Sequence, residues 1–336
     1  MRNDTILLDH GSGGKIAHQL TADLLMPMFS NPILAPLNDG AIFELGGARL
    51  AFSTDTFTVD PIFFPGGDIG DLAVNGTVND VAMCGAVPRY LSMGLILEEG
   101  FPMADLTRIL NSVRRALDAA GVQLVTGDTK VVPKGAADKI FINTTGIGLV
   151  PEGVEIHSRR ARPGDRIILS GTMADHGIAV LIQREGLRFD SAVRSDTAPL
   201  NHLVARILER TREVHVLRDP TRGGVGTTLN EIAEQSRVGV VLKEDHLPVD
   251  REVAGICELL GFDPLYLANE GKFLCVVPAQ VVDSVLEVMH ADPYGKNACV
   301  IGEVVADHPG RVVMQTRIGG QRIVDMLAGE QLPRIC

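Results

Sequence analysis

The chain has 336 residues, of which 45% are hydrophobic and 22% charged, and its formal net charge is −11. This length exceeds what a single hydrophobic core normally supports, so we expect two domains of an ordinary soluble globular protein. The negative charge argues against a general binder of nucleic acid or of anionic membranes. No apolar run approaches the roughly 20 residues that a membrane span requires, and the N-terminus lacks the apolar core of a signal peptide.

The five cysteines are an odd number and include no C-x-x-C pair, which argues against both a disulfide framework and a zinc ribbon. Four of them lie among apolar residues and are expected to be small buried side chains: Cys84, Cys257, Cys275 and Cys299. Only the terminal Cys336 differs. This usage of cysteine favours a reducing cytoplasm.

Residues 1–40 form a glycine-containing segment followed by a loop rich in proline and asparagine. A helical pattern begins at Lys15, directly after Gly11, Ser12, Gly13 and Gly14. Backbone N–H groups of such a segment can approach an anion at a helix N-terminus. The spacing is not that of a Walker A loop, and a flexible leader explains the glycines equally well.

Residues 41–155 are expected to form an N-terminal domain, with helices at 68–84 and 103–119 and strands at 49–54, 90–97, 122–125 and 139–149. The first helix is unusual. Asp71, Asn75 and Asn79 lie four residues apart and so share one face, where a surface helix would normally carry Lys and Glu.

Residues 156–320 follow a boundary rich in arginine, proline and glycine and are expected to form a C-terminal α/β domain. Strands and helices alternate in both halves, which predicts an α/β or α+β fold. The strands are expected at 165–170, 214–217, 238–242, 272–277, 299–305 and 311–316, and the helices from about 174 and at 199–209, 225–235, 251–260 and 279–289.

Several aspartates stand beside Gly, Asn or Thr at the ends of expected elements. Gathered carboxylates repel one another unless a cation lies between them, and their oxygens suit Mg²⁺ bridged to phosphates. For any one of them, a turn former or helix cap is the ordinary explanation. Together they favour a metal-assisted nucleotide site formed by Asp39, Asp55, Asp80, Asp128 and Asp219.

Two further residues have the chemistry of phosphoryl transfer. Lys130 follows Asp128 closely and could neutralise a transferring phosphoryl group, although a solvated surface lysine is the alternative. Glu270 lies between Asn269 and Gly271 and could be a general base, or a turn carboxylate. His10 and His176 are isolated, and we assign neither a role.

Residues 321–336 are expected to form a flexible tail that ends in Cys336. Pro333 disfavours a helix there, and a terminal thiol on an extended tether is suited to carrying a group into an active site. A frayed C-terminus that happens to end in cysteine is the simpler explanation.

Seven segments resemble the HypE family of carbamoyl dehydratases of hydrogenase maturation. That family is related to aminoimidazole ribonucleotide synthetase, selenophosphate synthetase and thiamine-monophosphate kinase. The ending 333–336 is the most specific of these segments, because the other ATP-dependent relatives lack it. The segments are His10–Gly14, Ser53–Asp55, Asn79–Ala82, Gly127–Lys130, Arg218–Gly224, Asn269–Gly271 and Pro333–Cys336.

The resemblance implies a two-domain aminoimidazole ribonucleotide synthetase-like fold, with N-terminal domains that pair in a homodimer and bind ATP and Mg²⁺ near the interface. The metal ligands would be Asp55, Asp80, Asp128 and Asp219. The ATP-binding residues would be these four together with Gly11, Ser12, Gly13, Gly14, Asp39, Gly223 and Gly224.

The activity implied by the resemblance is ATP-dependent dehydration. The carbamoyltransferase HypF would load Cys336 with a carbamoyl group, and ATP would drive its conversion to a thiocyanate. The cyano group would pass to iron on the HypC–HypD complex for nickel–iron hydrogenase.

This chemistry needs Mg²⁺, a cation, a base and a mobile thiol, which match the aspartates, Lys130, Glu270 and Cys336. Two other functions remain open from the residues alone. One is a different ATP-dependent small-molecule kinase or synthetase of the same family. The other is a non-enzymatic scaffold that displays its C-terminal peptide to a partner.

Overall fold

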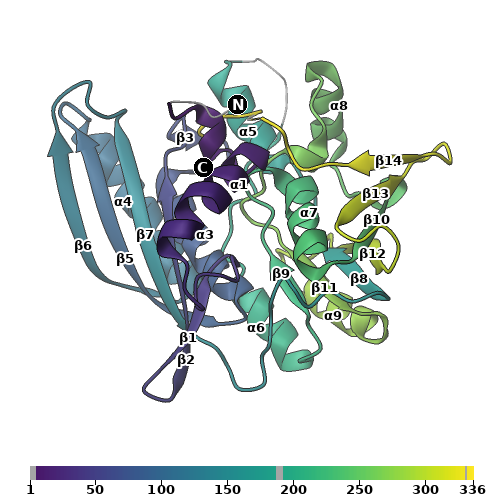
Figure 1. The fold of residues 1–336 in the computed structure, drawn as a ribbon. Helices are drawn as coiled ribbons and strands as arrows, with labels where there is room; N and C mark the ends of the chain where they lie inside the picture. Colours follow the sequence, from purple (N-terminus) through teal and green to yellow (C-terminus); the bar gives the residue numbers. More distant parts are fainter. Residues whose placement is uncertain (1–4, 187–191, 330) are drawn as a thin grey trace.

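The computed structural model of the chain describes residues 5–186, 192–329 and 331–336 (Figure 1). Residues 1–4, on which the expected lack of a signal peptide partly rests, and Glu330 in the expected tail lie outside the described part. Each half of the chain contains one large sheet with helices packed on it, and the two halves lie side by side. The predicted two-domain fold of mixed helices and strands is confirmed.

The N-terminal half is built on a five-stranded sheet in the order β1-β2-β7-β5-β6, in which only β5 and β6 are parallel. The strand predicted at 122–125 continues to Val132, because the residues after it pair in register with β5. The bounds are β1 Ala41–Leu45, β2 Ala48–Phe57, β5 Val87–Glu98, β6 Gln123–Val132 and β7 Ile140–Leu149, with a small hairpin of β3 Phe63–Phe64 and β4 Gly67–Asp68.

Helices α3 (Ile69–Met83) and α4 (Met103–Ala120) belong to this half, and α3 packs on one face of the sheet. Glycine on β7 lets α3 approach the sheet closely, because a Cβ at Gly148 would lie only 2.6 Å from Cγ1 of Val81 on α3. This packing brings the last turn of α3 beside β2. The position of Asp80 therefore depends on glycine at position 148 of β7.

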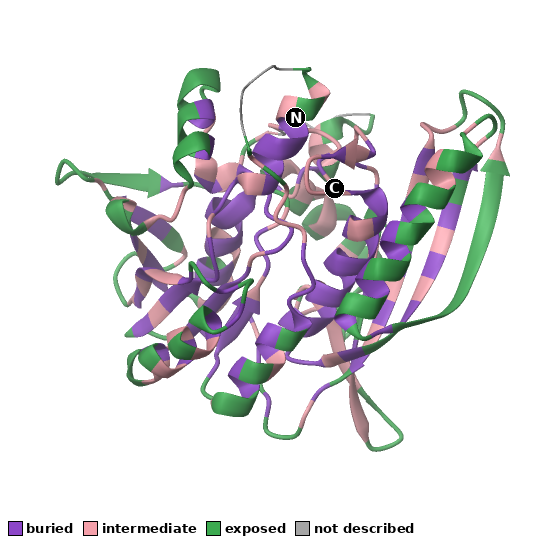
Figure 2. Ribbon diagram, turned by 180° about the vertical axis from the view of Figure 1, so that it is seen from behind, coloured by how far each residue is buried: buried purple, intermediate pink, exposed green. Residues whose placement is uncertain are grey.

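The other face of this sheet is open to solvent and partly apolar. Phe52, Tyr90, Ile96 and Leu149 are between 42% and 48% exposed on it. The edge strand β6 is exposed over almost its whole length, as Figure 2 shows in green. A solvent-exposed, partly apolar sheet face of this kind is a candidate contact surface for another protein chain.

The C-terminal half is built on a seven-stranded sheet in the order β14-β13-β10-β12-β8-β11-β9. Its last strand takes in residues 321–324, which had been expected to belong to the tail, because they pair antiparallel with β13. The bounds are β8 Asp165–Leu169, β9 Val216–Arg218, β10 Gly239–Lys243, β11 Leu274–Pro278, β12 Cys299–Val305, β13 Arg311–Gln315 and β14 Gln321–Val324.

Five α-helices accompany this second sheet among the described residues, and the N-terminal segment adds two short ones. The C-terminal helices are α5 Asp175–Arg184, α6 Asn201–Arg210, α7 Gly224–Ser236, α8 Arg251–Leu260 and α9 Val282–His290. The N-terminal ones are α1 Lys15–Leu20 and α2 Met26–Phe29. Within the described ranges, no helix combines the length and apolarity that crossing a membrane would require.

The polar face of α3 is where the two halves meet. Asn79 is 1% exposed, donates to the carbonyl of Ala198 over 3.0 Å and accepts from the Leu200 N–H over 2.8 Å. Asn75 donates to Thr197 Oγ1 over 3.1 Å. The unusual amides of this helix are therefore explained by inter-domain hydrogen bonds, which satisfy polar groups that burial would otherwise destabilise.

The final residues are docked between the halves. Leu332 is 9% exposed and Ile335 is 3% exposed, and both belong to the apolar cluster that also includes residues of α3, α4 and α5. The segment expected to be a flexible tail is thus ordered against the protein in this conformation. Its terminal residue reaches the N-terminal half, where the Thr58 N–H donates to the Cys336 carbonyl over 2.9 Å.

Candidate active site

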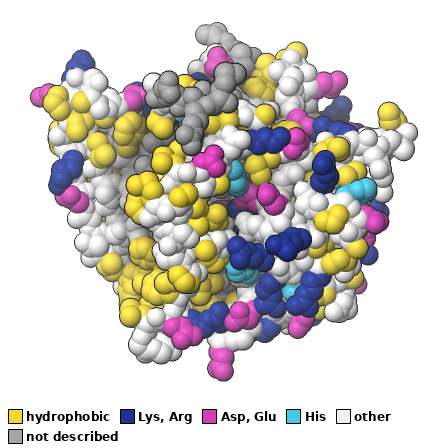
Figure 3. Space-filling view, viewed as in Figure 1, with side chains coloured by type: hydrophobic (Ala, Val, Ile, Leu, Met, Phe, Trp, Pro, Cys, Tyr) yellow, Lys and Arg dark blue, Asp and Glu magenta, His cyan; other side chains and the backbone are white. Residues whose placement is uncertain are grey.

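A pocket of about 520 Å³ lies between the two halves and is lined by four of the five predicted aspartates. Asp55 and Asp80 come from β2 and α3 of the N-terminal half, and Asp219 directly follows β9 of the C-terminal half. Asp39 precedes β1. Figure 3 shows acidic and basic side chains gathered around a hollow on this face of the molecule.

Ser53 links two of these aspartates. Its Oγ lies 2.7 Å from Oδ2 of Asp80 and 2.8 Å from the backbone carbonyl oxygen of Asp39. A hydroxyl has one proton and cannot donate to both oxygens. A protonated Asp80 that donates to Ser53, while Ser53 donates to Asp39, satisfies all three groups.

Burial and mutual repulsion raise the pKa of these carboxyl groups. Burial is the largest cause at Asp80 and Asp219, whose pKa values lie well above their ordinary range, and repulsion from Asp219 and Asp39 respectively comes next. Burial also raises the pKa of Asp39 to about 6, although the Arg218 guanidinium opposes this rise. The pocket therefore favours a bound cation or retained protons.

Arg218 is the counter-ion that the sequence analysis did not single out. Its guanidinium lies 2.5 Å from Oδ1 of Asp39 and 2.6 Å from Oε2 of Glu231, and neighbouring carboxylates raise its already high pKa. Glu231 also pairs with His18, over 2.9 Å. Arg218 lies within the quoted segment 218–224, but nothing in the sequence indicated that it would be buried.

The donor set fits a hard cation. Oδ2 of Asp39 is buried without a hydrogen-bond partner among the described atoms. No three His, Cys, Asp or Glu side chains in the described ranges converge into a complete metal site by themselves. Mg²⁺ does not require one, because it keeps several waters and takes phosphate oxygens from the nucleotide. The residues could therefore hold Mg²⁺ together with a nucleotide.

Residues 11–14 lie partly in the pocket lining and partly in the interior of the protein. Gly11 and Gly13 line the pocket, whereas Ser12 accepts from the Gly14 N–H over 3.2 Å and faces inward. A Cβ at Gly14 would lie 2.4 Å from the Leu327 carbonyl oxygen, so this glycine permits close packing. Gly223 and Gly224, both with positive φ, lead into α7, whose N-terminus follows the pocket residues Thr221 and Arg222.

Asp128 and Lys130 do not join the other residues within one chain. They lie on the edge strand β6, and two strands separate β6 from Asp55 on β2, a distance of about 14 Å. Their side chains pair with each other over 2.6 Å and are 70% and 69% exposed. Because Gly127 is in register with Met93, which is buried on the helix side, Asp128 and Lys130 point to the open face of the sheet.

Glu270 is buried beside the acidic pocket. It is 3% exposed, and its Oε1 has no hydrogen-bond partner among the described atoms. Burial raises its pKa well above the ordinary range, and repulsion from Asp196, Asp55 and Asp219 adds to this. A buried carboxyl group with a strongly raised pKa is a candidate for proton transfer, and its burial does not fit a solvent-exposed turn.

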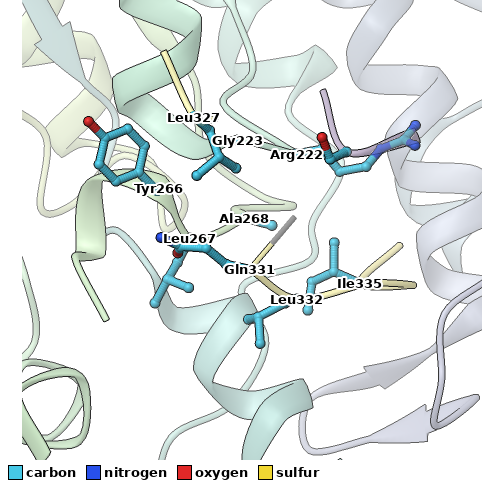
Figure 4. Close-up of a pocket in the computed structure, with 10 residues that line it drawn as sticks. Arg222, Gly223, Tyr266, Leu267, Ala268, Leu327, Gln331, Leu332 and Ile335 are labelled. Carbon is cyan, nitrogen blue, oxygen red and sulfur yellow. The ribbon is translucent and has the colours of Figure 1, made fainter. Parts of the chain in front are cut away.

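A second, smaller cavity lies between the docked tail and Arg222. This cavity of about 20 Å³, large enough for one water molecule, is lined by Leu332 and Ile335 of the tail and by Arg222 (Figure 4). Arg222 also lines the acidic pocket. The tail, Arg222 and the aspartates are thus contiguous. Cys336 is partly buried, and its carbonyl accepts from the N–H of Thr58, three residues after the pocket residue Asp55.

Two histidines without an assigned role are part of this arrangement. His10 lines the acidic pocket, and His176 is fully buried against the tail, with Nε2 2.8 Å from the Ile335 carbonyl oxygen. His10 belongs to the glycine-containing segment 10–14, so there was a reason in the sequence to expect it near the site. There was no such reason for His176, because it contacts a residue 159 positions away.

Comparison with known proteins agrees with this architecture. The family described as AIR synthase related protein matches twice, with its N-terminal domain at residues 37–150 and its C-terminal domain at residues 162–315. A protein of Azotobacter vinelandii named carbamoyl dehydratase HypE is 53% identical over 100% of this chain and 98% of its own length.

Two solved structures are also similar. A HypE–HypF complex contains a chain that is 47% identical, with a TM-score of 0.88 over 92% of this chain and 99% of that one. A hydrogenase maturation protein HypE in complex with ATP is 54% identical, with a TM-score of 0.84 over 99% of this chain and 100% of that one. The chain therefore belongs to the AIR synthase related family and, within it, to the HypE carbamoyl dehydratases.

Proposed function

We propose that this enzyme uses ATP to dehydrate a carbamoyl group carried on the Cys336 sulfur, which yields a thiocyanate for the iron of nickel–iron hydrogenase. The observation that carries the proposal is the docked tail, which shares Arg222 with the acidic pocket and whose last residue, Cys336, accepts from the Thr58 N–H, three residues after Asp55. The ATP complex of the HypE relative supports ATP as the co-substrate.

The reaction proceeds in two balanced steps. The carbamoyl oxygen attacks the γ-phosphorus of ATP and the amide nitrogen loses one proton, which gives an S-bound imidate phosphate and ADP. The second N–H proton is then removed while the C–O bond breaks, which leaves S–C≡N and inorganic phosphate. Phosphorylation is required because the carbamoyl oxygen is otherwise a poor leaving group, and a docked tail keeps water from hydrolysing the intermediate.

The described side chains divide these tasks. Asp55, Asp80 and Asp219 would hold Mg²⁺ with the nucleotide phosphates, and Mg²⁺ would offset the charge that develops on them. Glu270 would take the N–H proton as general base once a bound cation lowers its pKa. Its burial and its unpartnered Oε1 support this role.

Asp128 and Lys130 would act from a second copy of the chain. Among the described residues, the basic side chains that line the acidic pocket are His or Arg, and no lysine lines it. Lys130 instead faces the open, partly apolar side of the sheet. A homodimer formed through this face would cover the apolar residues and present Lys130 to the partner's phosphate site.

The partners follow from the chemistry and the relatives. The solved HypE–HypF complex supports HypF as the donor of the carbamoyl group. The HypC–HypD complex would accept the cyano group. No disulfide joins cysteines within the described residues, which suits the reducing cytoplasm where we place the reaction.

Intact-mass measurement tests the reaction. After HypF has loaded the chain, addition of ATP and Mg²⁺ should convert the carbamoyl adduct into one that is lighter by a water molecule, with one phosphate released for each conversion. Cys336→Ser should abolish both adducts. Glu270→Gln should retain the carbamoyl adduct and slow its conversion by at least about 100-fold, as expected for a general base. Undiminished ATP turnover and product formation by Cys336→Ser would instead indicate a small-molecule kinase.

The raised carboxyl pKa values predict how Mg²⁺ binding depends on pH. A carboxyl group whose pKa is raised in the folded state stabilises the protein fully below its ordinary pKa and loses this contribution as pH rises through the raised value. For Asp39 this contribution is lost between about pH 4 and about pH 6. For Asp80 and Asp219 the loss extends to higher pH. Mg²⁺ should therefore raise the melting temperature more at about pH 8 than at about pH 6.

Differential scanning calorimetry with and without Mg²⁺ measures this difference. Asp80→Asn should remove most of the Mg²⁺ effect, whereas the exposed Asp118→Asn should leave it unchanged. An equal shift at both pH values, or a full shift in Asp80→Asn, would rule out the proposed cation site.

Subunit mixing tests the placement of Lys130. Lys130→Ala chains and Cys336→Ser chains should each be inactive alone. In a mixed dimer, the tail of the Lys130→Ala chain meets an intact lysine from its partner, so dehydration should recover at one site per dimer. Absence of recovery in verified mixed dimers would show that Lys130 does not act across the interface.

A further inference from the structure

The backbone of the docked tail is held at three successive carbonyl groups. The Arg334 carbonyl accepts from the Asp60 N–H over 3.1 Å and from the Arg184 guanidinium over 2.8 Å. The Ile335 carbonyl oxygen lies 2.8 Å from His176 Nε2, and the Cys336 carbonyl accepts from the Thr58 N–H. Donors from both halves of the protein thus fix the last three residues at the place where the reaction is proposed to occur.

The hydrogen-bond partners of His176 determine which of its nitrogens carries the proton. A carbonyl oxygen only accepts, so Nε2 must carry the proton and donate to Ile335. Nδ1 then accepts from the Ser195 hydroxyl over 2.8 Å, and Ser195 Oγ accepts in turn from the Thr197 N–H over 3.2 Å. Every donor in this series has an acceptor. Burial lowers the pKa of His176, which agrees with a neutral ring.

Arg184 holds the tail from the far end of the same helix, α5. Besides the Arg334 carbonyl, it donates from Nε to the Asp60 carbonyl over 2.7 Å. Arg334 has a φ of +53°, in the left-handed region that residues with a side chain adopt at a cost of about 1 kcal/mol. The docked tail is therefore bent into a conformation that its surroundings must impose, and Arg184 is bonded at that bend.

The same elements are connected to Glu270. Ser195, the partner of His176, precedes Asp196, whose Oδ1 accepts from the Glu270 N–H over 3.0 Å. On the other side, Asn269 Oδ1 accepts from the N–H of Ala174, which directly precedes α5, over 2.8 Å. The position of α5 and the position of Glu270 are thus fixed by shared hydrogen bonds.

We propose that His176 and Arg184 are positioning residues of the dehydration step, which hold the last peptide carbonyls of the tail and so set where the Cys336 sulfur lies relative to Glu270. This inference rests on the proposed function. Because the two side chains bind backbone oxygens, they recognise the course of the tail rather than its side chains. They act only on the docked tail, so they are not needed when HypF loads the released one.

Paired substitutions test this role in the full-length protein. His176→Leu and Arg184→Met remove the donors and keep apolar volume, whereas His176→Gln keeps an N–H group near the place of Nε2. Each removal should raise the alkylation rate of Cys336 about fivefold or more, as the loss of a hydrogen bond of about 1 kcal/mol predicts. Dehydration of the preloaded tail should slow by about tenfold or more, because small displacements of reacting groups reduce rates strongly.

Three comparisons separate positioning from a general structural effect. Loading by HypF should be unchanged or faster, and His176→Gln should recover most of the dehydration rate. Arg210→Met removes the same side chain from the last residue of α6, where Arg210 pairs with Glu287, and should change neither rate. Should His176→Leu fail to fold, Arg184→Met carries the test, since Arg184 is only partly buried.

The outcomes distinguish this inference from the function on which it rests. If the wild-type chain does not convert the carbamoyl adduct, the proposed function fails, and the alkylation rates still decide whether the two residues hold the tail. If the wild-type chain converts it and the folded variants do so at the wild-type rate, the positioning role is wrong. Equal slowing of HypF loading and dehydration would also overturn it, because a residue that acts on the docked tail cannot impair loading.

Discussion

Mutual repulsion among buried carboxylates is the constraint on which the rest of this structure depends. Burial raises the pKa of Asp80 and of Asp219, repulsion from Asp219 and Asp39 adds to this at Asp80, and repulsion from Asp39 adds to it at Asp219. The single guanidinium of Arg218 lowers the pKa of Asp219 and of Asp39 without bringing either back to its ordinary range. Such a cluster is stable only with retained protons or an added cation. The cluster therefore retains protons or binds a cation, and Mg²⁺ is the cation that the proposed function would supply.

The packing of the N-terminal half maintains this cluster against its own repulsion. Glycines on β7 let α3 approach the sheet, and Ser53 hydrogen-bonds to both Asp80 and the backbone of Asp39. The amides of α3 fix the second half in place through Asn79. Because the pocket is formed by both halves, any change in their relative position changes the spacing of the carboxylates.

In the proposed function the tail has an opposite requirement, since it would have to be held for the reaction and released for loading and transfer. Its apolar anchors are the two side chains of Leu332 and Ile335, and its backbone is held by hydrogen bonds that water can replace. A left-handed residue at Arg334 adds strain that favours release. A tail held in this way can exclude water when docked and still leave the cleft.

Sequence reasoning recovered what local chemistry determines. The polar face of α3 and the pocket aspartates were recognisable because their residue types are unusual for their positions, and the carrier role of Cys336 stays a prediction. The burial of Arg218 and the contact of His176 with Ile335 were not, because they depend on segments brought together by tertiary packing. Asp128 and Lys130 look equivalent to the other site residues in the sequence, and only the strand order shows that one chain keeps them apart.

The fate of the carbamoyl oxygen tests the central claim most directly. A tail loaded with an ¹⁸O-labelled carbamoyl group can be converted in the presence of ATP, and the released phosphate and water analysed by mass spectrometry. Because the account has this oxygen attack the γ-phosphorus, the label should appear in inorganic phosphate in proportion to the thiocyanate formed. Recovery of the label in water, with unlabelled phosphate, would show that ATP hydrolysis and dehydration are separate events and would contradict the account.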